Sequence, residues 1–111
     1  MSEQQPLGAA IAAVWTKNLP QTRERLELLQ RAADDLATSR TIDDDIRAEA
    51  TAVAHKLAGS LGMFGMHDAT EAARAIEQNL EQDGLPQPER LQEQVAALHA
   101  LLAPHLQDAS S

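Results

Sequence analysis

His55 is the residue of this 111-residue chain whose type and surroundings most clearly suggest chemistry. Apolar residues near it recur at helical spacing, and a helix advances about 100° per residue. On that helical wheel the residues opposite His55 form a continuous apolar stripe: Ile46, Ala50, Val53, Leu57, Leu61 and Phe64. Because an apolar stripe faces the core, His55 is predicted to point outward. This placement argues against a buried, hydrogen-bonded core histidine.

The helix face around His55 carries only small side chains. The residues within about 60° of it are Ala48, Thr51, Ala52, Ala58, Gly59 and Gly62. A solvated face would ordinarily carry Glu, Lys and Gln, which are good helix formers. Gly59 lies one turn beyond His55, although glycine costs about 1 kcal/mol relative to alanine inside a helix. We interpret Gly59 as clearance beside the ring; a close helix crossing is the alternative.

The chemistry that suits such a histidine is nucleophilic attack on phosphorus. A neutral imidazole can attack through one ring nitrogen without a separate general base. Lys56 is predicted to stabilise the phosphate, since it lies about 100° away on the same turn; an ordinary solvated lysine is the alternative. Ser60 is a further candidate hydrogen-bond donor. For His55 itself the alternative is an incidental surface histidine.

Other kinds of site have little support in the sequence. His67, His99 and His105 share no turn with one another or with His55, and the chain has no cysteine, so no metal site is expected. The sequence contains no paired acid and base, no phosphate-cradling loop and no nucleotide site. A turnover enzyme is therefore not expected, nor is autophosphorylation from ATP. The run 43–45 of three aspartates is interpreted as helix capping, with partner choice as the alternative.

Five helical segments are predicted to position these residues. They span 7–18, 20–39, 41 or 42 to 63, 68–82 and 88–104. Pro20 and Pro88 suit the first turn of a helix, Gly84 stands where a left-handed residue is wanted, and Pro104 is expected to end or kink the last helix. Trp15 is expected to anchor the first segment. The predicted fold is all-α, an antiparallel up-down four-helix bundle with an additional short N-terminal helix.

Composition sets the broad class of the protein. The length suits a single domain over 1–111, with loose tails at 1–6 and 108–111. Aromatics make up 2%, so alanine and leucine must fill the core. The net charge of -8 repels nucleic acid and anionic lipid, and neither is an expected partner. With no membrane-length apolar stretch, no secretory leader and no cysteine, we expect a cytoplasmic protein.

Residues 54–65, with the sequence AHKLAGSLGMFG, resemble the signature of the histidine phosphotransfer (HPt) domain family of bacterial two-component phosphorelays. By that resemblance His55 is the phosphoacceptor, with Gly59 and Gly65 at the expected offsets. Segment 72–77 is similar to the stretch that usually follows. Ala58 departs from the pattern, because many members carry there a lysine that assists transfer. Lys56 is a candidate replacement for it.

The resemblance implies a phosphorelay intermediate that exchanges a phosphoryl group between His55 and an aspartate of response-regulator receiver domains. The receiver would supply Mg²⁺, so no intrinsic cofactor is expected, and a sensor or hybrid histidine kinase would act upstream. We expect a monomer. The predicted partner surface consists of Thr51, Ala52, Ala58, Gly62, Met63 and Met66, with ordinary packing as the alternative for the two methionines. Two other functions remain open: a degenerate adaptor that binds a receiver or kinase without carrying phosphate, and a purely structural helical bundle.

Overall fold

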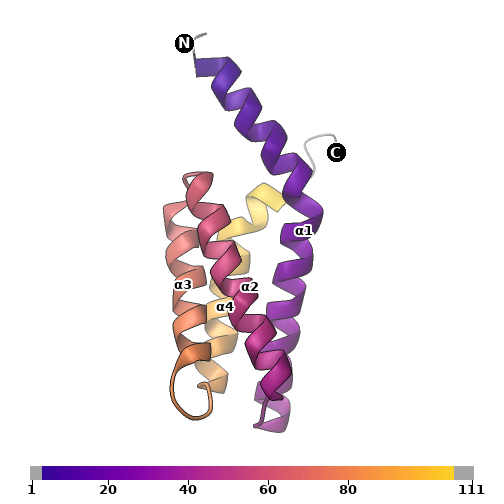
Figure 1. The fold of residues 1–111 in the computed structure, drawn as a ribbon, viewed down its shortest axis with the longest axis vertical. Helices are drawn as coiled ribbons and strands as arrows, with labels where there is room; N and C mark the ends of the chain where they lie inside the picture. The colour runs from indigo at the N-terminus through magenta and orange to yellow at the C-terminus, as the bar shows by residue number, and fades with distance from the viewer. Residues whose placement is uncertain (1–3, 107–111) are drawn as a thin grey trace.

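The chain folds as a bundle of four helices in a computed structural model that describes residues 4–106, and their side chains from residue 11 onward. The helices are α1 (Gln4–Ser39), α2 (Asp44–Met63), α3 (His67–Glu81) and α4 (Pro88–Leu106). Each helix runs opposite to the next, and the N-terminal half of α1 extends beyond the other three helices (Figure 1). α2 packs against α1 and α3, and α4 packs against the same two helices. The predicted all-α up-down bundle is confirmed.

The separate N-terminal helix was a wrong prediction. Segments 7–18 and 20–39 form one α-helix of 36 residues, with Pro20 inside it. Proline removes one backbone N–H but does not by itself force a break, and packing beside it favours continuity. Leu19 and Thr22 flank the proline and are 3% and 2% exposed. Residues 4–6, expected to be loose, are helical; the tails 1–3 and 107–111 lie outside the described residues.

The remaining helix limits agree with the predictions to within three residues. α2 begins at Asp44 after Asp43, whose backbone is extended but whose side chain makes no capping hydrogen bond in the described structure. The aspartates of the first turn therefore act through their charge near the helix dipole. α4 continues through Pro104, so of the two effects expected of this proline, an end or a kink, it does not produce an end. Gly84 has the predicted left-handed backbone, with φ +78°.

Leucine and alanine fill the core, as the low aromatic content predicts. The largest fully buried apolar side chains are Leu29, Leu36, Leu57, Leu61, Ile76, Leu80, Leu91, Leu98, Leu102 and Val95. Trp15 anchors α1 as expected. Its ring meets Phe64 edge to face at 5.0 Å, and its Nε1 donates to the carbonyl of His105 at 2.8 Å. Trp15 thus joins α1 to the ends of α2 and α4.

The buried face of α2 is rotated from the predicted stripe. The buried residues are Ala50, Ala54, Leu57, Ala58 and Leu61, whereas Ile46 is 37% exposed. The rotation follows from the neighbours of α2, because its most extensive packing is against α3. A stripe calculated from apolar residues alone weights the bulky Ile46 and Val53 over alanines that permit close helix approach. His55 consequently lies at the edge of the α2–α3 seam.

Candidate functional site at His55

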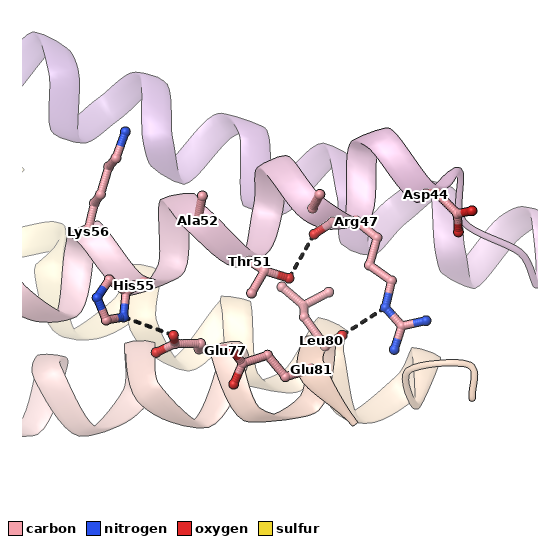
Figure 2. Close-up of a pocket in the computed structure, with 10 residues that line it drawn as sticks. Asp44, Arg47, Thr51, Ala52, His55, Lys56, Glu77, Leu80 and Glu81 are labelled. Carbon is pink, nitrogen blue, oxygen red and sulfur yellow. Dashed lines mark hydrogen bonds and ion pairs between the residues drawn. The ribbon is translucent and has the colours of Figure 1, made fainter. Parts of the chain in front are cut away.

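His55 projects from the middle of α2 and is open to solvent. Its side chain is 76% exposed, which confirms the predicted outward aspect. The ring is nevertheless held: Nδ1 lies 2.9 Å from Oε2 of Glu77 on α3. Figure 2 shows this contact, with the second ring nitrogen on the side of the imidazole away from Glu77.

The Glu77 contact selects a tautomer of the ring. A carboxylate only accepts hydrogen bonds, so the proton of a neutral imidazole is assigned to Nδ1. Nε2 then keeps its lone pair and is the nucleophilic nitrogen. The same carboxylate stabilises the positive charge that the ring gains when Nε2 forms a bond. This pair can therefore both orient and activate an exposed histidine.

Sequence reasoning did not give Glu77 a role. Its side chain is 18% exposed, which is low for a glutamate. It follows Ile76 on the flank of the α3 core face formed with Ala73 and Leu80. An acidic residue on the flank of an apolar stripe was the available signal, but many such residues are merely solvated. Only the packing of α3 against α2 shows that it reaches His55.

Two shallow grooves adjoin His55, one toward each end of α2. The first, here called the Arg47 groove, is drawn in Figure 2. It is lined by Asp44, Arg47, Ala48, Thr51, Ala52, His55, Lys56, Glu77, Leu80 and Glu81. The second, here called the Arg74 groove, is lined by His55, Ala58, Gly59, Arg74, Glu77, Gln78 and Glu81. His55 and the two glutamates are common to both.

Arg47 has a structural position that the sequence did not suggest. Its Nε donates to the Leu80 carbonyl at 2.7 Å, and a terminal nitrogen donates to the Gln82 carbonyl at 2.6 Å. Carbonyls at a helix C-terminus lack intrahelical partners, so Arg47 caps α3 and ties it to the start of α2. The hydroxyl of Thr51 in turn donates to the Arg47 carbonyl at 2.7 Å. The guanidinium of Arg47 is thus engaged in holding the two helices together.

The predicted phosphate-handling residues lie in different places. Lys56 lines the Arg47 groove and is exposed, but Figure 2 shows its side chain extending away from Glu77 and α3. Ser60 is half-buried and lines neither groove. Gly59 lines the Arg74 groove, and a Cβ built on it would meet no described atom within 4 Å. The missing side chain at Gly59 is therefore not needed to make room for the imidazole ring of His55 itself. The alternative of a close helix crossing is wrong.

The predicted partner surface is only partly exposed. Ala52, Gly62 and Met63 are exposed, with Met63 at 83%. Thr51 and Met66 are half-buried, and Met66 packs against the core, as its alternative interpretation states.

The prediction that Ala58 belongs to an exposed partner surface was wrong. It is 5% exposed and belongs to the core, because the rotation of α2 turns it toward α3. It lines the Arg74 groove but is not an open contact residue.

Within residues 4–106, no group of three or more His, Cys, Asp or Glu side chains is placed to hold a metal ion. No helix in the same range is long and apolar enough to cross a membrane.

Comparison with known proteins points to one family. The Hpt domain family matches residues 13–105. Protein RcaC of Microchaete diplosiphon is 37% identical over 76 residues, which make up 68% of this chain. The matched part is 11% of RcaC, so this chain spans only about a tenth of the length of that relative. No solved structure matches the chain significantly.

Proposed function

Because this chain belongs to the Hpt domain family, we propose that His55 accepts a phosphoryl group and exchanges it with an aspartate of response-regulator receiver domains. Hpt domains are phosphotransfer modules of two-component phosphorelays and not classical enzymes. The observation that carries the proposal is the exposed imidazole whose Nδ1 is held by Glu77 at 2.9 Å. It leaves Nε2 as the acceptor atom.

The transfer step needs no proton movement at His55. The lone pair of Nε2 attacks the phosphorus of an aspartyl phosphate, and the N–P bond forms as the bond from phosphorus to the aspartate oxygen breaks. The aspartate leaves as a carboxylate with the electron pair of that bond. The proton on Nδ1 stays hydrogen-bonded to Glu77, which balances the positive charge of the substituted ring. The reverse step returns the phosphoryl group to aspartate.

The partner is proposed to supply the remaining machinery. Phosphoryl transfer relies on positioning and on neutralising charge around a loose transition state. In this proposal Mg²⁺ and the acidic pocket belong to the receiver, and the chain contributes the oriented histidine without a cofactor of its own. A sensor or hybrid histidine kinase is the expected upstream source. The protein is expected to act as a monomer in the cytoplasm, where such partners exchange phosphate.

The first test is transfer from a panel of phosphorylated receiver domains in the presence of Mg²⁺. The chain should gain one acid-labile, base-stable phosphoryl group on Nε2 of His55, identified by mass and ³¹P NMR, and His55→Gln should gain none. ATP alone should give no label. Binding of a receiver without label on either protein would reject phosphotransfer in favour of the adaptor function.

A second test addresses the nucleophile. Glu77→Ala should slow transfer by roughly 10- to 100-fold, since hydrogen bonds to charged groups contribute about 1.5–3 kcal/mol. Glu77→Gln keeps an acceptor oxygen without the charge, and its transfer rate should lie between those of Glu77→Ala and the unsubstituted protein. Glu93→Ala is the matched control, because Glu93 is an exposed glutamate on α4 that lines neither groove. Equal rates for Glu77→Ala and the unsubstituted protein would contradict the assigned role.

A further inference from the structure

We propose that Arg74, on α3, binds the phosphoryl group carried by His55 and supplies the positive charge of the site. This inference rests on the proposed function of His55. The charges around His55 are unbalanced. Glu77 and Glu81 line both grooves at His55, so an incoming phosphoryl group meets two carboxylates. A cation must offset that repulsion.

Among the described residues, the basic side chains that line the two grooves are Arg47, Lys56 and Arg74. Arg47 donates to the carbonyls at the end of α3 and holds the helices together. Lys56 extends away from α3 (Figure 2). Arg74 also shares a groove with His55, and its guanidinium is held only by an exposed 3.7 Å ion pair with Glu71, so it is the cation on α3 that is free to turn toward the histidine.

The register of α2 against α3 gives Arg74 a path to the histidine. His55 contacts Glu77, and a Cβ built on Gly62 would lie 3.7 Å from Oγ1 of Thr70. Both contacts fit one antiparallel register, in which each step forward along α2 is a step back along α3. That register places Arg74 opposite Ala58, one turn from His55.

The residues between Arg74 and His55 leave the path open. Ala58 lines the groove with only a methyl group, and Gly59 beside it presents no side chain. A guanidinium on a long, flexible side chain can therefore lie across this part of α2 and reach a group on Nε2. The bare surface beside His55 thus accommodates a cation that comes from the neighbouring helix.

Arg74 is held loosely in the unphosphorylated protein. Its ion pair with Glu71 spans 3.7 Å, with side chains 57% and 74% exposed. Exposed pairs of this length contribute little, so the guanidinium is readily released to a better partner. A phosphoryl group offers two oxygens to the guanidinium fork, which gives a bidentate, charge-assisted contact. Arg74 takes no part in the bond changes of the transfer step; it binds phosphoryl oxygens before and after it.

The experiment uses a small donor, so that it does not depend on any receiver. His55 in the intact chain is phosphorylated with phosphoramidate, and the ³¹P titration midpoint of the phosphohistidine and the ¹⁵Nε shift of Arg74 are followed by NMR. The Arg74 Nε–H signal should shift on phosphorylation. The ³¹P midpoint should be higher in Arg74→Ala than in the unsubstituted protein, and Arg74→Lys should restore part of the difference.

Transfer rates give the second readout. Arg74→Ala should slow transfer from a phosphorylated receiver by roughly 10-fold, whereas Arg90→Ala, the same change of charge at an exposed site on α4, should not. Lys56→Ala should slow transfer less than Arg74→Ala does. An unchanged ³¹P midpoint in Arg74→Ala, or a larger effect of Lys56→Ala, overturns the role of Arg74 while phosphotransfer stands. Absence of label on His55 from phosphoramidate and from every phosphorylated receiver overturns both proposals.

Discussion

Replacement of Gly59 by alanine should stabilise the protein and slow phosphoryl transfer. One added methyl group should therefore raise the free energy of unfolding and lower the transfer rate. Gly59 lies inside α2, is exposed, and would place its Cβ more than 4 Å from every described neighbour that could obstruct it. The substitution should therefore gain the full difference in helix propensity, about 0.8–1.0 kcal/mol. For a domain of this size, that corresponds to a rise in Tm of about 4 °C.

The loss of transfer has a separate cause. The added methyl group enters the Arg74 groove one turn from His55, in the space proposed for the phosphoryl group and the Arg74 guanidinium. Misplacement of reacting groups is costly, and a decrease in the transfer rate of roughly 10-fold is expected. The affinity for an unphosphorylated receiver should change less than the rate.

Thermal unfolding and single-turnover transfer from a phosphorylated receiver measure the two effects. Gly62→Ala is the matched variant, because its Cβ would make an ordinary 3.7 Å contact with Thr70 near the end of the same helix. Gly62→Ala should change both quantities less than Gly59→Ala. A stabilised Gly59→Ala variant that transfers as fast as the unsubstituted protein would refute the clearance argument. A destabilised variant would refute the open geometry at Gly59.

Three further outcomes follow from the packing and electrostatics. Leu57→Ala should lower the free energy of unfolding in urea by about 3 kcal/mol, since Leu57 is fully buried; a loss below about 1 kcal/mol would contradict that burial. Gly65→Ala should cost about 1–2 kcal/mol in the same assay, because φ is +75° there, and a neutral result would reject the left-handed turn. The pKa of Glu89 lies below its usual range, because its own backbone N–H and then Arg40, at 2.8 Å, stabilise the carboxylate. The resulting stabilisation is present at neutral pH and is lost as pH falls through the lowered pKa. In a carboxyl ¹³C titration, Arg40→Ala should raise this pKa part of the way to its usual value, and no change would exclude the ion pair.

The sequence predicts most of the helices and the exposure of His55, because these depend on local signals. Helical spacing and turn-forming glycines locate α2, α3 and α4. Pro20 misleads because its local cost is outweighed by the burial of Leu19 and Thr22, which only the bundle provides. Local sequence signals alone therefore predict a helix boundary at Pro20, although tertiary packing keeps the helix continuous there.

The partners of His55 could not be predicted in the same way. Glu77 and Arg74 come from the next helix, and their distance to His55 depends on how far α2 is rotated about its axis. That rotation brings Ala58 into the core, and it was missed because alanine contributes little to an apolar stripe while permitting close approach. The residue proposed to carry the phosphoryl group is recognisable from its own surroundings, but the residues proposed to assist it are recognisable only after packing.

Trp15 gives this chain a built-in optical reporter. It is the only tryptophan in the sequence, and it touches Phe64 at the end of α2 and His105 near the end of α4. Phe64 is nine residues beyond His55, or about 13 Å along the helix axis. Events confined to the imidazole should therefore leave the emission spectrum unchanged, whereas separation of α1 from the bundle should shift it to longer wavelength. Fluorescence thus distinguishes a local change at His55 from opening of the bundle, without an added dye.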